Sequence, residues 1–368
     1  MISRIELQNF RGFKDFKTTL TPITVLGGRN NAGKTSILEA LLFLYSHSDP
    51  NCFFQMNFFR HMNDQALYTP ERLWAPLFYG FNLDKGMSIL LEDSVFGNKV
   101  LRIYKGNEQS QSVDFNLNAL RNNFLHNGAV MQKYTLKFSY KSRNVDEAGY
   151  YSIETTPPVP VLPNYNPVNI NYTHKKIAPN TPLTAVFFFK SETFMNHNNL
   201  AQWFGQLILN DKKAVVLKAF KLFDNNIVDV QTIVKGMSGY IYAIYGDGRK
   251  MPVSYMGDGM NRMVNILLSI LANPSSLILI DEVENGFHYS MYQKFWELIG
   301  SVAIENNCQI IANTHSSDLL RGAVNGLKSV KLLDKLSYIR LDKKDDIVAN
   351  VFDSGLINYA LDAEMEVR

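Results

Sequence analysis

Polar and apolar residues follow two different periods along the chain, and these periods predict a protein that mixes strands and helices. Apolar residues take every second position in segments 87–93, 99–106 and 133–143, as in strands with one face toward water. In segments 34–47 and 261–272 they recur every three or four positions, as in amphipathic helices. The pattern therefore predicts an α/β protein.

Continuous apolar runs mark a second kind of strand, which we expect to be buried on both faces. Such runs occupy residues 23–28 (ITVLGG), 276–282 (SLILIDE) and 308–315 (CQIIANTH). Strands of this kind that alternate with helices predict a mainly parallel sheet, and the alternating strands after the first helix predict an inserted antiparallel portion. Residues 197–224 have helical spacing and predict a helical lobe.

One segment breaks both periods. Residues 157–182 hold seven of the 13 prolines together with many Asn and Tyr residues, which predicts an irregular excursion within an insertion at 144–182. We expect a single domain over residues 1–368, built from an N-terminal lobe (1–190), a helical lobe (191–260) and a C-terminal lobe (261–368).

Composition and charge exclude several classes of protein. Hydrophobic residues make up 46% and charged residues 19% of the chain, which suits a globular protein with a full core. Cys52 and Cys308 form no CxxC pair, which argues against a zinc site and suits a reducing cytosol. We find neither a long apolar run nor a signal peptide, so we expect a cytoplasmic protein without a membrane span. The excess of Lys and Arg lies in the first half, which permits a nucleic-acid partner without requiring one.

The stretch GGRNNAGKTS (27–36) has the full spacing of a phosphate-binding loop. Its glycines let backbone N–H groups point at phosphate oxygens, while Lys34 places a charge between the β- and γ-phosphates and the Thr35 hydroxyl ligates Mg²⁺. A plain glycine turn is the alternative, but a strand before the loop and a helix after it favour the phosphate loop. The predicted ATP-binding residues are Gly28, Asn30, Asn31, Gly33, Lys34, Thr35 and Ser36.

Two acids end the apolar run LILIDE, at the strand end that opens beside a phosphate loop in a parallel sheet. We expect Asp281 to hold Mg²⁺ and Glu282 to orient or deprotonate the attacking water. His315, at the end of another strand, can contact the γ-phosphate. Alone, the two acids would suit an ordinary strand-to-turn junction and the histidine a structural role; the phosphate loop upstream favours the catalytic interpretation.

A second glycine loop, SYMGDGMNRM (254–263), leads into a predicted helix that starts near Asn261. Its small residues and the helix N-terminus can also present N–H groups to phosphate. One nucleotide is not easily enclosed by two such loops of one chain, so this loop is either a simple helix cap or a contact to the nucleotide of another subunit. The candidate residues are Ser254, Gly257, Asp258 and Gly259.

Five stretches in this order resemble the motifs of the ABC-type ATPase heads of RecF, SMC proteins and the OLD (overcoming lysogenization defect) ATPases: IELQNFRGFKD, GGRNNAGKTS, SYMGDGMNRM, LILIDEVENGFH and IIANTHS. The likeness is greatest to the OLD ATPases, in which DE-x-ENG-x-H and GDG recur. The resemblance implies an ABC-type P-loop ATPase head that has a mainly parallel sheet, an antiparallel β portion and a helical lobe, and that uses ATP and Mg²⁺.

The resemblance also implies roles for further residues. The second glycine loop would be the signature loop, which caps the γ-phosphate bound by the partner in a head-to-head dimer. The stretch VENGFH (283–288) would be the D-loop, with Asn285 and His288 contacting the partner, and Arg11 would lie near the nucleotide unless it is simply a surface residue. Asn31 replaces a glycine of the SMC-like loop but tolerates positive φ. The signature departs from Ser-Gly-Gly-Gln, so we expect slow hydrolysis.

The chain is similar to these families only in the head. Residues 195–235 are too few for an SMC coiled coil, and those after His315 are too few for a Toprim domain of about 100 residues. The resemblance therefore implies an ATPase that controls a separately encoded effector, a nuclease or toxin, in antiphage defence. A RecF-like DNA-binding ATPase in repair is the alternative, and a transporter subunit fits the motifs poorly.

Overall fold

The computed structural model divides the chain into two compact units. The first unit comprises Met1–Arg4, Thr18–Leu38 and Leu183–Arg368, and the second comprises Ile5–Lys17 and Glu39–Pro182. The division into three lobes stays a prediction. The residues that the structure describes are 1–47, 49, 52–53, 56, 73–94, 97–106, 109–111, 131–143, 145–155, 168–176, 185–190 and 196–362.

A six-stranded sheet forms the centre of the first unit, counted over the described residues. Every neighbouring pair is parallel except the last, so the predicted mainly parallel sheet is confirmed. Three of these strands, β14 (Leu277–Ile280), β15 (Gln309–Asn313) and β3 (Ile23–Gly28), bury nearly all their side chains, which explains why they are continuous apolar runs in the sequence. In spatial order they are β10 (Val186–Phe189), β14 (Leu277–Ile280), β15 (Gln309–Asn313), β3 (Ile23–Gly28), β16 (Leu336–Lys343) and β17 (Ile347–Phe352).

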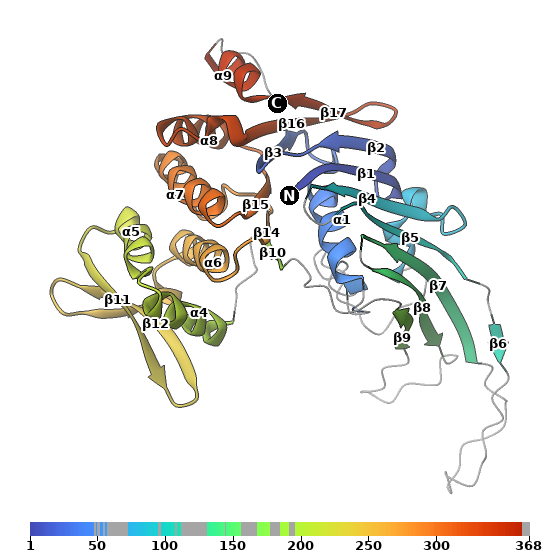
Figure 1. The fold of residues 1–368 in the computed structure, drawn as a ribbon, viewed down its shortest axis with the longest axis horizontal. Helices are drawn as coiled ribbons and strands as arrows, with labels where there is room; N and C mark the ends of the chain where they lie inside the picture. Colours follow the sequence, from blue (N-terminus) through green and yellow to red (C-terminus); the bar gives the residue numbers. More distant parts are fainter. Residues whose placement is uncertain are drawn as a thin grey trace, which may run out of the picture. The chain divides into compact units, whose positions relative to one another are not determined.

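Three helices of the first unit lie side by side against this sheet (Figure 1): α6 (Asp258–Ala272), α7 (Tyr292–Glu305) and α8 (Ser317–Ser329). Their apolar side chains share one hydrophobic core with the central strands. α6 is buried from Gly259 to Leu271, and its buried positions include the polar residues Asn261, Arg262, Asn265 and Ser269. The unit also contains α9 (Ser354–Asp362), the start of α1 (Lys34–Ser46) and the short helices η5 (Val253–Tyr255), η6 (Tyr289–Met291) and η7 (Leu333–Lys335).

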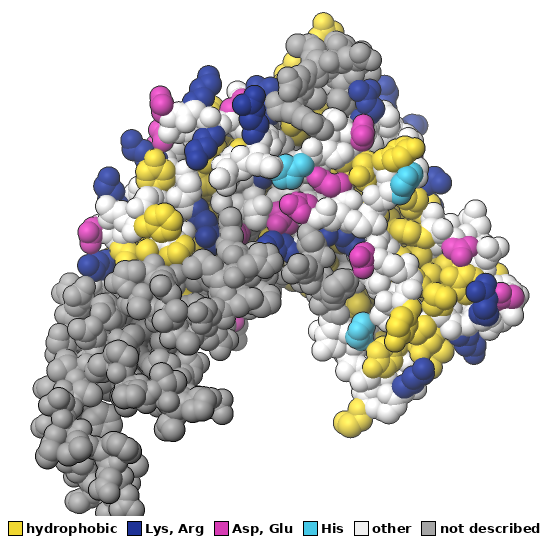
Figure 2. All heavy atoms as spheres, turned by 180° about the vertical axis from the view of Figure 1, so that it is seen from behind, with side chains coloured by type: hydrophobic (Ala, Val, Ile, Leu, Met, Phe, Trp, Pro, Cys, Tyr) yellow, Lys and Arg dark blue, Asp and Glu magenta, His cyan; other side chains and the backbone are white. Residues whose placement is uncertain are grey.

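The predicted helical region of the first unit is two helices beside a small antiparallel sheet. α4 (His197–Leu209) is capped by Asn196, whose side chain accepts the N–H of Asn198 at 2.8 Å. Val234 and Met237 are exposed apolar residues of this region. Figure 2 shows hydrophobic, Lys and Arg side chains together on the face of the molecule that it draws. The other elements are α5 (Lys213–Phe223), β11 (Ile227–Lys235), β12 (Ser238–Tyr245) and β13 (Lys250–Pro252).

The second unit is built on an antiparallel sheet, in agreement with the predicted antiparallel portion. Its path is β2-β1-β4-β5-β7-β8-β9, and β6 pairs with β7 at the side. An aromatic cluster around Phe53 packs inside the unit, with T-shaped contacts to Phe43 and Tyr151. The elements are β1 (Ile2–Phe10), β2 (Phe13–Thr19), β4 (Met87–Asp93), β5 (Lys99–Lys105), β6 (Gln109–Gln111), β7 (Met131–Lys141), β8 (Asp146–Thr155), β9 (Val168–Lys176), η2 (Ala75–Leu77) and η3 (Tyr79–Phe81).

Two predictions about elements need correction. The segment 157–182 is not irregular throughout, because Val168–Lys176 forms β9 and pairs with β8; the rest of that segment lies outside the described residues. Its alternation was hidden by the prolines on either side. The helix expected from Asn261 begins three residues earlier, at Asp258. No helix in the described part of the chain is long and apolar enough to cross a membrane.

Candidate nucleotide site

The loop between β3 and α1 has the backbone of a phosphate-binding loop. Gly28, Asn31 and Gly33 have φ values of 122°, 64° and 91°, so the chain turns through the left-handed region three times. The expectation that Asn31 replaces a glycine there with positive φ is confirmed. A Cβ on Gly28 would lie 2.3 Å from the carbonyl oxygen of Leu341, so only glycine fits. Asn30 and Asn31 are exposed at the tip of the loop, and Ser36 is buried below it.

Lys34 lies inside the curve of this loop. Its Nζ donates to the carbonyl oxygens of Gly28 at 2.7 Å and Arg29 at 3.0 Å, and the residue is only 5% exposed. Burial lowers the pKa of Lys34, against the opposite effect of the carboxylates of Glu284, Asp281 and Glu282. A compact cation that is held in a loop of N–H groups suits the oxygens of a polyphosphate.

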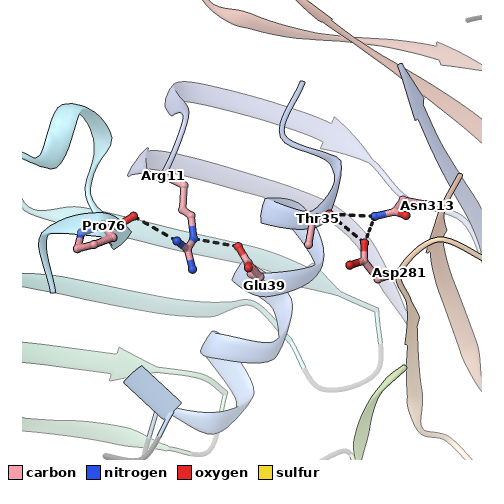
Figure 3. Close-up of polar contacts among 6 residues, drawn as sticks. All are labelled: Arg11, Thr35, Glu39, Pro76, Asp281 and Asn313. Carbon is pink, nitrogen blue, oxygen red and sulfur yellow. Dashed lines mark hydrogen bonds and ion pairs between the residues drawn. The ribbon is translucent and has the colours of Figure 1, made fainter. Parts of the chain in front are cut away.

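Thr35 and Asp281 meet directly (Figure 3), as the sequence predicted for a magnesium site. The Thr35 hydroxyl donates to Oδ1 of Asp281 at 2.9 Å, and Asn313 Nδ2 donates to the same carboxylate oxygen. Burial raises the pKa of Asp281, while its hydrogen bonds from Asn313 and Thr35 act in the opposite direction. A hydroxyl and a carboxylate are hard oxygen donors, so these residues fit Mg²⁺ bound together with a nucleotide phosphate.

Glu282 follows Asp281 in an unusual backbone conformation. Its φ is 50°, in the left-handed region, and its N–H donates to Oδ1 of Asn313 at 2.6 Å. Asn285 Nδ2 donates to Oε2 of Glu282 at 2.6 Å, which fixes the carboxylate. A carboxylate that is held beside a phosphate loop and beside residues that fit Mg²⁺ can accept the proton of an attacking water.

His315 also lies beside Lys34, with its Nδ1 3.4 Å from Nζ of the lysine. The loop that carries it is tied to the loop after β14 by Glu284. Oε1 of Glu284 accepts the His315 N–H at 2.7 Å, and Oε2 accepts the Thr314 hydroxyl at 2.8 Å. The structure therefore brings together all the residues predicted around the phosphates in the first unit.

The second glycine loop lies against the stretch VENG of the same chain. A Cβ on Gly259 would meet the carbonyl oxygen of Gly286 at 2.2 Å, so the two backbones are in direct contact. Gly257 has φ 88° and precedes the first turn of α6, where Asn261 Nδ2 donates to its carbonyl oxygen at 3.0 Å. The remaining predicted members of this loop, Ser254 and Asp258, are exposed.

Three residues of the site were not predicted from the sequence: Arg262, Glu284 and Asn313. Nη2 of Arg262 donates to the carbonyl oxygens of Asp281 at 2.6 Å and Glu282 at 3.1 Å. Asn313 bonds to both acids, and Glu284 joins two loops, as described above. The local signals for them were weak. Asn313 and Glu284 each follow an apolar run, and Arg262 is a charged residue within an apolar helical pattern.

Two other predicted residues make contacts within the chain. In the second unit, Arg11 Nε lies 2.9 Å from Oε2 of Glu39, and its Nη1 donates to the carbonyl oxygen of Pro76 at 3.4 Å (Figure 3). His288 precedes η6 and its ring accepts the N–H of Ser290. The nucleotide contact of Arg11 and the partner contacts of Asn285 and His288 stay predictions.

Comparisons with known proteins agree with this geometry. One protein-family model, "AAA ATPase domain", matches residues 1–143, and another, "AAA domain, putative AbiEii toxin, Type IV TA system", matches residues 172–321. An "ATP/GTP phosphatase" of Helicobacter pylori is 24% identical over 329 residues, which are 87% of this chain and 86% of that protein. A "DNA replication and repair protein RecF" of Acholeplasma laidlawii is 46% identical over 44 residues, 12% of this chain and 13% of that protein.

Solved structures show the fold. An SMC head bound to the C-winged helix domain of ScpA superposes with a TM-score of 0.50 at 12% identity, over 96% of this chain and 98% of that chain. The chain therefore has the SMC head-like α/β fold of an ABC-type P-loop ATPase head. The family models and the phosphatase relative support nucleotide hydrolysis. The narrower likeness to the OLD ATPases stays a prediction.

Proposed function

We propose that this chain is an OLD-like ATPase that dimerises head to head around ATP and thereby controls a separately encoded effector in antiphage defence. The observation that carries the ATPase part is the cluster of Lys34, Thr35, Asp281 and Glu282. Hydrogen bonds to Gly28, Arg29, Asn313 and Asn285 hold it in one place. Each side chain of the cluster has a distinct use in hydrolysis of a nucleoside triphosphate.

The roles follow from the contacts. Lys34 exchanges the carbonyl oxygens of its own loop for the β- and γ-phosphate oxygens, which carry full negative charge and are stronger acceptors. Thr35 and Asp281 would hold Mg²⁺, which neutralises charge on the phosphates when bound. Glu282, oriented by Asn285, accepts the proton of the attacking water, and His315, which lies beside Lys34, reaches the γ-phosphate.

The second glycine loop supports a composite site. Ser254 and Asp258 are exposed, and Asp258 is the first residue of the 15-residue helix α6. Such a helix start attracts phosphate. A two-fold dimer places the loop of each chain at the nucleotide of the other, so two nucleotides are enclosed by two equal interfaces.

The effector is inferred from relatives. The description of one matching family model names a toxin of a type IV toxin–antitoxin system. The superposed SMC head is bound to a domain of another protein, ScpA. Both support an ATPase head that acts through a partner chain. An ATP-dependent change between monomer and dimer gives such a partner two states to distinguish.

Light scattering with and without ATP and Mg²⁺ tests the dimer. The Glu282→Gln protein should bind ATP without hydrolysing it and run as a dimer, whereas Lys34→Ala should stay a monomer that binds no nucleotide. Normal hydrolysis by Glu282→Gln would show that Glu282 is not the catalytic carboxylate. An oligomeric state that is the same with and without ATP would contradict dimerisation around ATP.

Phage challenge tests the role in defence. Cells that carry the gene with its neighbouring gene should form fewer plaques than cells that carry the Lys34→Ala version of the same pair. Equal plaque numbers over a broad set of phages would refute that role. Salt-dependent binding of duplex DNA by the chain alone with ATP would instead support a repair clamp.

A further inference from the structure

Arg262 is a buried cation that has no part in the nucleotide contacts predicted above. It lies in the first turns of α6, just beyond Gly259, and is 8% exposed. Its Nη2 donates to the carbonyl oxygens of Asp281 and Glu282 at 2.6 and 3.1 Å. One nitrogen of the guanidinium therefore holds both peptides that follow β14.

The backbone that Arg262 holds is in a disfavoured conformation. Glu282 has φ 50°, where its Cβ crowds the backbone. Its N–H donates to Asn313, and its carbonyl oxygen accepts both the Arg262 donor and the N–H of Asn285 at 3.0 Å. Such strain persists only where surrounding bonds over-determine it, and it is concentrated at functional sites.

Stability alone does not explain a guanidinium at this place. A buried Arg needs acceptors for its five N–H groups, and Nε of Arg262 has no hydrogen-bond partner among the described residues. Burial lowers the pKa of Arg262, against the effect of the carboxylates of Asp281, Glu284 and Glu282. A long apolar side chain would fill the same part of the core without this penalty. We therefore attribute the positive charge of Arg262 to the loop after β14, which carries Asp281, Glu282 and Glu284.

We infer that Arg262 is a positioning residue for hydrolysis, which holds the peptides of Asp281 and Glu282 so that the Glu282 carboxylate stays at the place of the attacking water. This inference rests on the proposed function, in which Glu282 accepts the proton of that water. The main phosphate contact is separate, because Lys34 is held by the carbonyl oxygens of Gly28 and Arg29 and not by the loop after β14. Arg262 also lies on the helix that begins with the second glycine loop, so it joins this loop to the carboxylate of the same chain.

Steady-state kinetics of Arg262→Gln and Arg262→Lys test the inference. Loss of the two backbone bonds lets Glu282 relax by about 1 Å, for which we expect a kcat about 100-fold lower in Arg262→Gln. The KM for ATP should change less than about two-fold, because ground-state binding is retained. Arg262→Lys keeps one charged donor and should recover part of kcat, and it serves as the second variant if Arg262→Gln does not fold.

Ser269→Ala is the matched control on the same helix. Ser269 is fully buried, and its hydroxyl donates to the carbonyl oxygen of Asn265 at 2.8 Å within α6. This control should leave kcat and KM unchanged. A wild-type kcat in both folded Arg262 variants, or a loss that appears wholly in ATP affinity, would overturn the inference.

Mixed dimers distinguish an effect of Arg262 on Glu282 of the same chain from an effect through the second glycine loop. An Arg262→Gln chain mixed with a Glu282→Gln chain should stay inactive, because each composite site then lacks a working Glu282. Recovery of activity would show that Arg262 acts through the second glycine loop instead, and would overturn the inference. The positive control pairs Glu282→Gln with Gly257→Val, since one composite site of that dimer is intact. Failure of this control would refute the composite site, whereas the kinetic test of Arg262 would stand.

Discussion

The contact between Gly259 and Gly286 makes Gly259→Ala the sharpest test of how the second glycine loop is held. The new Cβ would lie 2.2 Å from the carbonyl oxygen of Gly286, whereas a carbon and a carbonyl oxygen approach to about 3.3 Å. The two backbones must therefore separate by about 1 Å. Overpacking of this kind costs about 1–3 kcal/mol, and the better helix propensity of Ala returns about 0.5–1 kcal/mol.

Because the new Cβ meets a backbone oxygen, the overpacking cost lies in the upper half of that range, and the net effect is a loss of about 1–2.5 kcal/mol in the free energy of unfolding. For a unit of this size that lowers the melting temperature by about 2–10 °C in a calorimetric scan. Hydrolysis should fall about 100-fold, because Gly286 follows Asn285, which holds the Glu282 carboxylate at 2.6 Å, and a 1 Å shift there misplaces the general base. ATP binding by the monomer should be retained, since Lys34 lies outside this contact.

Gly205→Ala is the matched control for the same substitution. Gly205 lies within α4, where a Cβ would meet nothing within 4 Å, so Ala should stabilise the helix by about 0.5–1 kcal/mol. Its hydrolysis should be unchanged. A Gly259→Ala protein that melts and hydrolyses ATP like the wild type would show that the two loops move apart freely, and the argument from their contact would be wrong.

Two further substitutions test the roles of Asp281 and Arg11. Burial raises the pKa of Asp281, so this carboxyl stabilises the fold below its unfolded pKa and loses that contribution as pH rises through the folded value. Asp281→Asn should therefore raise the melting temperature at pH 7, with a gain that vanishes in acid, while Mg²⁺-dependent hydrolysis falls at least about 100-fold; an unchanged melting temperature at pH 7 would contradict the buried charge. Arg11→Ala removes a cation from the fully buried Glu39 and should cost about 3–5 kcal/mol, whereas Arg11→Met with Glu39→Leu should restore most of the stability. The ATP affinity of that folded double variant then decides whether Arg11 contacts nucleotide: a wild-type value excludes the contact.

Local signals made part of the site predictable. The strand β3 and its loop combine an apolar run, glycines and a following helix within a few residues, so their geometry depends little on the rest of the chain. The same holds for Asp281 and Glu282, which end an apolar run. Asn31 was predictable as well, because its positive φ follows from the turn itself.

The remaining part of the site depends on contacts between distant segments. Asn313 and Arg262 are ordinary polar residues in the sequence, and their importance comes from bonds to the two peptides after β14. Helix α8 was also missed, although its apolar residues recur at helical spacing and Ser316 caps it, so a local signal was present. Its Gly322 and Gly326 are required by the close approach of α7, where a Cβ on Gly326 would lie 2.5 Å from the Gln293 carbonyl oxygen. Tertiary contacts decided the roles of Asn313, Arg262 and these glycines, and no local pattern shows such contacts.

The contacts of the loop after β14 have a consequence for how the site can move. Its backbone is held by Arg262 from α6 and by Asn313 from β15, while Glu284 extends from it to the loop of His315. Gly286, further along, lies against Gly259. Because close-packed backbone and short hydrogen bonds resist small deformations, these loops have few arrangements between fully joined and separated. If a nucleotide phosphate binds one of these loops more tightly in the joined arrangement, it therefore also stabilises the position of Glu282. The size of this stabilisation is limited by the difference in the affinity of the phosphate for the joined and the separated arrangement.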